Sequence, residues 1–178
     1  GDGTISLALN ALPDNLSFGY IPSGSGNDFA RSLGLSFDPI QAFKNIRHNK
    51  TRDFYVMHYK SQSFSGYALN NVGIGLDAAI VKATNEGRMK TILNSLKLGR
   101  LSYLLTALHV LFTKKPFEIS VYNMKNAFKF DNAFLLTFTK HPYFGGGIQI
   151  APEATNLSQE IHLVELDRYS IPKIFSLI

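Results

Sequence analysis

The stretch I-P-S-G-S-G-N-D-F-A-R-S-L-G-L, residues 21–35, decides the fold of this chain. It follows an apolar segment, 16–21, that predicts a short buried strand, and it leads into a helix with Phe29 and Leu33 inward and Gly34 as its stop. Glycine lets main-chain N–H groups approach an anion, and a helix N-terminus adds unpaired donors and the positive end of the dipole. This order predicts an α/β unit with a phosphate loop, Gly24, Ser25, Gly26, Asn27 and Asp28, the last two being candidate helix caps.

A second glycine loop stands at the start of the chain, where Gly1-Asp2-Gly3-Thr4 leads into a segment with a helical stripe, Ile5, Ala8, Leu9 and Leu12. Two such loops in one layer form a phosphate cradle. The carboxylates of Asp2 and Asp28 could hold Mg²⁺ or accept a hydroxyl proton. Taken singly, tight turns and helix caps explain the same residues, and neither loop has the Walker A or the G-x-G-x-x-G sequence.

The predicted secondary structure changes in character near residue 50, from helices to mainly strands. Before it, Asp38-Pro39 predicts a further helix, with Ile40, Phe43 and Ile46 inward. After it, segments rich in Val, Ile, Phe and Tyr predict antiparallel strands, with a hairpin turn at 123–126 and one helical interruption near 88–112. The expected strands are 53–59, 66–74, 117–122, 127–139, 147–151 and 160–166.

The composition narrows the class of protein. The chain has 178 residues, 45% of them hydrophobic, which supports a packed fold, and no cysteine, which excludes a disulfide framework. Its longest apolar stretch, 101–112, is shorter than the roughly 20 residues that a membrane span needs. The five histidines lack metal-ligand spacing. The net charge is +5, and a basic balance suits nucleic acid, nucleotide phosphates or an anionic membrane. Basic residues gather at Lys82, Arg88, Lys90, Lys97, Arg100, Lys114 and Lys115.

Four ordered segments resemble the diacylglycerol kinase catalytic-domain family. Residues 1–4 and 21–35 resemble its GGDGT and I-P-x-G-T-G-N-D-F-A-R segments, 70–78 resembles N-x-x-G-x-G-x-D-A, and 143–152 resembles its glycine-triplet strand. The chain is most similar to the bacterial soluble lipid kinases. The resemblance implies an α+β fold of two domains, with a partial α/β ATP-binding layer at 1–50 packed on an antiparallel β-sandwich at 51–178, like that of NAD kinase and diacylglycerol kinase.

The resemblance also implies a function, the ATP-dependent transfer of a phosphoryl group to the hydroxyl of diacylglycerol or a related lipid, with Mg²⁺. Asp2 becomes the candidate catalytic and metal-binding carboxylate, and Asp77 a second metal ligand or a turn acceptor. The family has an Asp-Gly turn, whose Asp is implicated as general base, where this chain has Ser158-Gln159, and Glu160 is the acid that could serve there. The nucleotide-binding residues implied are Gly1, Asp2, Gly3, Thr4, Gly24, Ser25, Gly26, Asn27 and Asp28.

Two other functions stay open. NAD kinase shares the G-D-G-T loop, and the departed Asp-Gly turn is compatible with a non-catalytic lipid- or nucleotide-binding relative. We expect a cytoplasmic protein that meets its lipid substrate at the inner face of the membrane, through peripheral contact made by the basic region 82–115. We expect no nucleic-acid partner and leave oligomerisation open. The start at Gly1 suggests a piece of a longer protein that holds only half of its ATP pocket.

Overall fold

The computed structural model describes residues 1–13, 16–24, 26–48, 51–76, 78–79, 113–144 and 149–167. The chain forms two compact units. Unit 1 comprises Gly1–Val72 and Phe138–His162, and unit 2 comprises Gly73–Thr137 and Leu163–Ile178. This division follows the packing of the chain, whereas the boundary near residue 50 is a division into family domains and stays a prediction. The predicted helical interruption at 88–112 lies outside the described residues.

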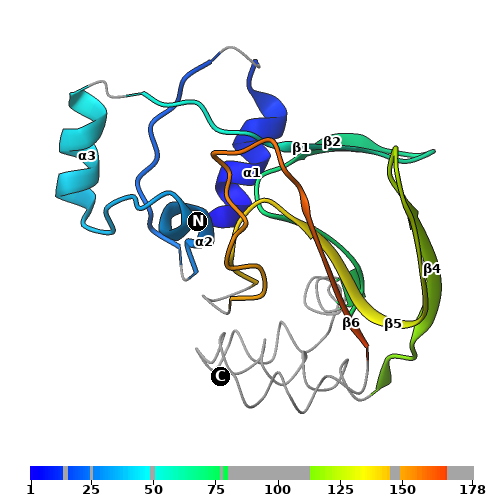
Figure 1. Cartoon of the computed structure of the whole chain (residues 1–178). Helices are drawn as coiled ribbons and strands as arrows, with labels where there is room; N and C mark the ends of the chain where they lie inside the picture. The colour runs from blue at the N-terminus through cyan, green and yellow to red at the C-terminus, as the bar shows by residue number, and fades with distance from the viewer. Residues whose placement is uncertain are drawn as a thin grey trace. The chain divides into compact units, whose positions relative to one another are not determined.

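Three helices in unit 1 confirm the predicted ones: α1 (Asp2–Ala11), α2 (Asp28–Ser32) and α3 (Pro39–Arg47), as labelled in Figure 1. The predicted stripe of α1 turns Ile5 into the core, where it packs with Phe29 and Leu33 around α2. Gly34 ends α2 with a φ of 63°, a left-handed conformation that glycine adopts without strain. The two glycine loops therefore lie at the N-termini of two helices that share one core.

The segment 16–21, predicted to be a buried strand, is not one. It has no regular structure, and Leu16 is 50% exposed. A strand is stabilised by hydrogen bonds to a neighbour, and within the described residues this segment pairs with none. It still contributes to the core, since Phe18 packs edge-on against Phe54 with ring centroids 6.2 Å apart. The apolar pattern identified a packed segment but not its hydrogen bonding.

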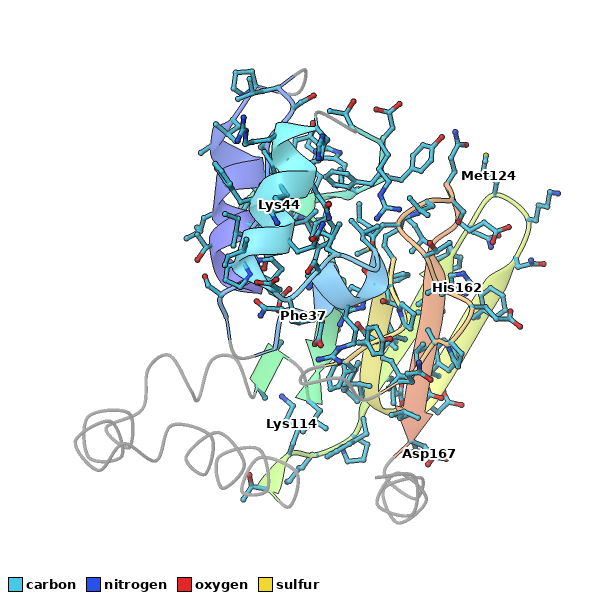
Figure 2. All side chains as sticks on the ribbon, turned by 90° about the vertical axis from the view of Figure 1, so that its left-hand side faces the viewer. Phe37, Lys44, Lys114, Met124, His162 and Asp167 are labelled. Carbon is cyan, nitrogen blue, oxygen red and sulfur yellow. The ribbon has the colours of Figure 1, made fainter. Side chains whose placement is uncertain are left out.

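Helix α3 begins where it was predicted to begin, but the residues predicted to lie on its buried face are exposed. The Asp38 carboxylate accepts the N–H of Ile40 at 3.0 Å and so caps the helix. Ile40 and Phe43, predicted to lie inward, are 65% and 54% exposed, and Ala42 is the buried residue of the helix. Helical periodicity tells which residues share a face, but what covers that face is decided by tertiary packing. Lys44, labelled in Figure 2, lies on this helix.

Strands β1 (Met57–Lys60) and β2 (Ser65–Ala68) form an antiparallel pair in unit 1, in the register Met57↔Ala68 to Lys60↔Ser65. Helix α1 joins the edge of β2 through one side chain. The amide of Asn10 accepts the N–H of Tyr67 at 2.8 Å and donates to its carbonyl at 2.9 Å. Asn10 thus occupies the place of a neighbouring strand and attaches α1 to the sheet.

Strands β3 (Asn71–Gly75), β4 (Phe117–Tyr122), β5 (Ala127–Thr139) and β6 (His162–Asp167) form a sheet in the order β3-β5-β4, with β6 also paired to β5. Strands β4 and β5 are antiparallel, and their predicted hairpin turn is confirmed by a bond from the N–H of Asn123 to the carbonyl of Asn126. Met124 projects from the tip of this hairpin (Figure 2). Residues 133–137 of β5 are buried without alternation, as in a strand covered on both faces.

Four of the six predicted strands differ from the observed ones in their bounds or lie partly outside the described residues. The segment 66–74 is two strands, β2 and β3, separated at Leu69 and Asn70. Strand β1 begins at Met57, four residues later than predicted, and β6 begins at His162 instead of 160. In 147–151 the described residues contain one isolated bridge, from Gln149 to Tyr143.

The predicted α+β class is confirmed, because the helices are separate from the antiparallel strands. Among the described helices, none has the length and apolarity to cross a bilayer.

One buried side chain ties three segments of unit 1 together. The Asn156 amide donates to the carbonyl of Leu69 at 2.7 Å and to that of Tyr55 at 3.3 Å, and its Oδ1 accepts the Ser32 hydroxyl at 3.4 Å. Its own carbonyl accepts the N–H of Tyr55 at 2.7 Å. The loop after β5 is therefore fixed to helix α2 and to the segment before β1.

Replacing Asn156 by Ala should lower the free energy of unfolding by about 1–3 kcal/mol, because two main-chain carbonyls lose their buried donor. Urea unfolding followed by circular dichroism measures this. Gln159→Ala, at an exposed position of the same loop, is the control and should change the midpoint little. Equal midpoints for the two variants would contradict the role of Asn156.

Candidate functional site

The two glycine loops touch through their main chains. A Cβ built on Gly24 would lie 2.5 Å from the Cα of Gly1, and one built on Gly1 would lie 3.0 Å from the Cα of Gly24. Neither position has room for a side chain, so glycine is required at both by this close approach. The structure therefore brings together the two loops that the sequence indicated as one cradle.

Asp2, the first residue of α1, joins the loops by hydrogen bonds. Its Oδ2 accepts the N–H of Asp28 at 3.1 Å, and its Oδ1 accepts the N–H of Phe29 at 3.0 Å. Both donors belong to the first turn of α2, so this carboxylate satisfies free N–H groups and places a negative charge at the positive end of the helix. The cap of α2 comes from Asp2, not from the side chain of Asn27 or Asp28 as predicted.

Asn27 holds the second loop in shape. It has a φ of 52°, a left-handed conformation that asparagine tolerates, and its side chain is buried. Its Oδ1 accepts the N–H of Gly24 at 2.9 Å and the hydroxyl of Tyr20 at 3.2 Å, and its Nδ2 donates to the Gly24 carbonyl at 2.8 Å. Burial, with the charge of Asp2, raises the pKa of Tyr20, which keeps its hydroxyl a donor. Asn27 thus ties its own side chain to both main-chain polar groups of Gly24 and to Tyr20.

The first turn of α1 is open to a ligand. Gly1 is its N-cap and provides no side-chain cap, and both Gly3 and Thr4 are exposed. A Cβ on Gly3 would meet no atom within 4 Å. Free N–H groups at the positive end of a ten-residue helix form an anion site. Gly1, Gly3 and Thr4 therefore lie where a phosphate group could bind.

Helix α2 carries a cation, Arg31, in its last turn. The Nε of Arg31 is 3.8 Å from the buried Asp28 carboxylate, and its Nη2 donates to the Gly26 carbonyl at 3.4 Å. Its guanidinium lies 5.5 Å from the ring centroid of Phe37 and 5.6 Å from that of Tyr143. Two aromatic rings and a carboxylate hold this side chain in one place. Arg31 keeps the charge of Asp28 balanced.

His141 is a buried candidate residue that the sequence did not indicate. It is 1% exposed, and its Nδ1 accepts the N–H of Tyr143 at 2.9 Å. Burial lowers its pKa to about 4, although the charge of Asp2 acts in the opposite direction. The imidazole is therefore neutral at neutral pH and carries its proton on Nε2. In the sequence, only its position just before the glycine-triplet segment could have drawn attention to His141. A search for histidines at metal-ligand spacing does not select it.

The side chain of Glu160 is 81% exposed, with its Oε2 4.0 Å from the Nε2 of His162. Among the residues that the structure describes, no hydrogen bond or ion pair joins it to the glycine loops. Its carbonyl accepts the Nζ of Lys140 at 2.7 Å, as does that of Ser158. The ammonium of this lysine thus holds the segment that stands where the family has the Asp-Gly turn.

The remaining predicted residues fall into two groups. Ser25 and Asp77 lie outside the described residues. Asp2 and Asp28 offer carboxylate oxygens, the ligand type that Mg²⁺ prefers, although both oxygens of Asp2 already accept main-chain N–H groups. Within the described part of the chain, no three His, Asp or Glu side chains gather around one point. The donor set therefore fits an ion held by one or two carboxylates and by phosphate oxygens, as Mg²⁺ usually is.

Comparison with known proteins agrees with this geometry. Residues 1–59 match the diacylglycerol kinase catalytic domain, and residues 70–164 match the YegS C-terminal NAD kinase beta sandwich-like domain. The chain is 30% identical, over its whole length, to the Bacillus subtilis (strain 168) protein named "Putative lipid kinase YtlR" and covers 60% of that protein. It is 28% identical over 82% of its length to a Staphylococcus carnosus (strain TM300) protein named "Putative lipid kinase", of which it covers 45%.

The chain thus spans about half the length of these relatives. A solved structure from Bacillus anthracis str. Sterne, titled as that of a "putative diacylglycerol kinase", has the same fold. It superposes with a TM-score of 0.68 at 21% identity, over 99% of this chain and 56% of its own. With both family models matched in order over 1–59 and 70–164, the chain belongs to the family of proteins in which a diacylglycerol kinase catalytic domain is followed by a YegS C-terminal NAD kinase beta sandwich-like domain.

Proposed function

We propose that this protein is an ATP-dependent lipid kinase that transfers the γ-phosphoryl group to a hydroxyl of diacylglycerol or a related lipid. The bridge made by Asp2 supports this proposal most directly, because it places the N-terminal turns of α1 and α2 side by side. The N-terminal turn of α1, with the glycine loop that the bridge holds beside it, would provide main-chain donors for a chain of phosphates. The alternatives are an NAD kinase-like enzyme and a non-catalytic relative that binds lipid or nucleotide.

The cradle would act mainly by positioning and by electrostatics. Phosphoryl transfer needs the attacking and leaving oxygens in line and the charge on the phosphoryl oxygens balanced. The N–H groups of Gly3 and Thr4 on α1, and those of Ser25, Gly26 and Asn27 in the second loop, would bind the triphosphate, whereas the N–H groups of Gly24 and Asp28 already bind Asn27 and Asp2. Mg²⁺, held by Asp2 and by Asp77 together with phosphate oxygens, would supply further positive charge. Because Asn27 already fixes the second loop, little ordering is needed at the moment of reaction.

The hydroxyl of the lipid needs a carboxylate that orients it and takes its proton. Asp2 is the candidate at the cradle, and Glu160 is the candidate at the position of the departed Asp-Gly turn. The two differ in what holds them: Asp2 is fixed by two hydrogen bonds, whereas the carboxylate of Glu160 is exposed and only its main chain is fixed, by Lys140. We favour Asp2 for phosphate and metal binding and Glu160 for the proton.

The activity is tested with the natural full-length protein, labelled ATP and a total lipid extract. The proposal predicts label in a lipid product, which mass spectrometry then identifies. Label in NADP⁺ when NAD⁺ is the acceptor, with none in lipid, would favour the NAD kinase alternative. ATP binding without transfer to either acceptor would favour the non-catalytic relative.

In the same assay, Asp2→Asn should lower kcat by at least about 100-fold, because a carboxylate that binds metal or orients the hydroxyl acts mainly in the transition state. The amide also turns an N–H donor toward one of the two main-chain N–H groups of α2. Thermal unfolding should therefore show a loss of about 1–3 kcal/mol as well. A kcat equal to that of the natural protein would exclude Asp2 from the chemistry.

Gly24→Ala should weaken ATP binding by more than about tenfold, since a methyl group 2.5 Å from the Cα of Gly1 forces the loops apart. Isothermal calorimetry measures the affinity. Gly3→Ala is the matched control for stability, because its methyl group enters open space. Gly24→Ala should lower the melting temperature, and Gly3→Ala should not. An ATP affinity of Gly24→Ala equal to that of the natural protein would contradict a phosphate site formed by the two loops.

Peripheral contact with the cytoplasmic face of the membrane is the last part of this proposal, and it rests on the basic region 82–115. The double variant Lys97→Glu, Arg100→Glu should lose about 1 kcal/mol of affinity per residue for vesicles of an anionic phospholipid. Co-sedimentation measures the binding. Lys44→Glu, Arg47→Glu on α3 makes the same charge change elsewhere, and equal losses in both double variants would show that total charge, not this region, attracts the membrane.

A further inference from the structure

Beyond the two loops, unit 1 contains a buried donor that the fold leaves without a partner. The Nδ1 of His141 is used, because it accepts the N–H of Tyr143 at 2.9 Å. The Nε2 is buried, and within the described residues no acceptor lies within hydrogen-bonding distance of it. A neutral imidazole whose Nδ1 accepts must carry its proton on Nε2, so the atom without a partner is a donor.

This imidazole is held in one orientation by its own main chain. The Thr139 hydroxyl donates to the His141 carbonyl at 2.7 Å and accepts the His141 N–H at 3.2 Å. Together with the Tyr143 N–H on Nδ1, these bonds fix both the backbone and the ring. Leaving a buried donor unsatisfied costs free energy, so a side chain fixed in this way is expected to have a partner that binds from outside the chain.

The position of the partner follows from the contacts around the ring. His141 accepts the N–H of Tyr143, and the Tyr143 ring lies 5.6 Å from the guanidinium of Arg31, whose Nη2 donates to the Gly26 carbonyl of the second glycine loop. The ring therefore belongs to the surroundings of the cradle, in agreement with the electrostatic effect of Asp2 on His141, and the open part of the cradle is the N-terminal turn of α1, where Gly3 and Thr4 are exposed. The charge of Asp2 itself is taken up by two N–H groups of α2, which leaves the donors of α1 for another anion.

We propose that His141 is a nucleotide-positioning residue, which donates its Nε2–H to a phosphate oxygen bound at the N-terminal turn of α1. The inference rests on the proposed kinase function and adds to it a residue that none of the four family motifs contains. A neutral donor suits this place, because it binds an anion without attracting the neighbouring carboxylate as a cation would. The pKa of about 4 keeps it neutral at every pH above 5, so the donor is always present.

Two substitutions separate the two nitrogens of the ring. The amide of His141→Asn reaches the place of Nδ1 and can accept the Tyr143 N–H, but it has no donor at the place of Nε2. The amide of His141→Gln brings its NH₂ group to the place of Nε2. In the natural full-length protein we expect His141→Asn to weaken ATP binding by about tenfold or more, as loss of a hydrogen bond to a charged group does, and His141→Gln to restore most of it.

Nuclear magnetic resonance of the unsubstituted protein, with ¹⁵N-labelled histidine, gives a test that depends on no variant. Addition of ATP or inorganic triphosphate should move the His141 Nε2–H resonance downfield and slow its exchange with water, whereas adenosine should not. An unmoved resonance with saturating ATP, or equal ATP affinity for His141→Asn and the natural protein, would overturn the inference and assign Nε2 to a bound water.

The failure of the inference is distinct from that of the kinase proposal. Lipid phosphorylation by the natural protein together with unimpaired His141→Asn would refute the positioning role and keep the kinase. A shifted Nε2–H resonance in a protein that labels no lipid would keep the phosphate contact and refute the kinase. Absence of any ATP binding by the full-length protein would refute both.

Discussion

The carboxylate of Asp2 is the interaction on which the candidate site depends. It connects two segments that lie 26 residues apart in sequence, because one residue begins α1 and accepts the first N–H groups of α2. Without it the second helix would start with unsatisfied donors, and the contact of Gly1 with Gly24 would have nothing to hold it. One side chain thus supplies a helix cap, the junction of two loops and the local negative charge. Its structural and chemical roles cannot be separated by loss of activity alone.

Other polar side chains of unit 1 fix loops in the same way, by binding the main chain. Most of its buried side-chain bonds go to main-chain atoms: Asn27 binds Gly24, Asn156 binds Leu69, and Lys140 binds Glu160. Bonds of this kind fix loops, which carry no regular hydrogen-bond ladder of their own. His141 differs from them, since one nitrogen binds the main chain and the other does not. A buried donor that is held in place but has no hydrogen-bond partner calls for an explanation, and a ligand that binds from outside is one.

Sequence reasoning predicted the helices well, and for a clear reason. Caps and stops are local, so Asp38 and Gly34 mark the start of α3 and the end of α2 correctly. Apart from the strand boundaries, the errors concern contacts between distant residues. No local pattern tells that Asp2 caps α2, that Ile40 faces outward, or that 16–21 has no strand neighbour among the described residues. The same holds for His141, whose importance appears only with its burial and the free Nε2.

Lys140 shows how far the site departs from the family pattern. In the family an Asp-Gly turn precedes the last strand, and the backbone of such a turn is set by its glycine. Here the chain has Ser158-Gln159, and a lysine from the preceding loop binds two carbonyls of that segment instead. Burial lowers the pKa of Lys140, yet the two carbonyls and the ring of Tyr55, 5.5 Å from Nζ, favour its charged form. The segment is thus fixed by a buried cation, and with it the main chain of Glu160, the acid proposed to replace the family's aspartate. Because Glu160 stands two residues after the position of that aspartate and its side chain is one methylene longer, the proposed role requires that this lysine keep the main chain in place.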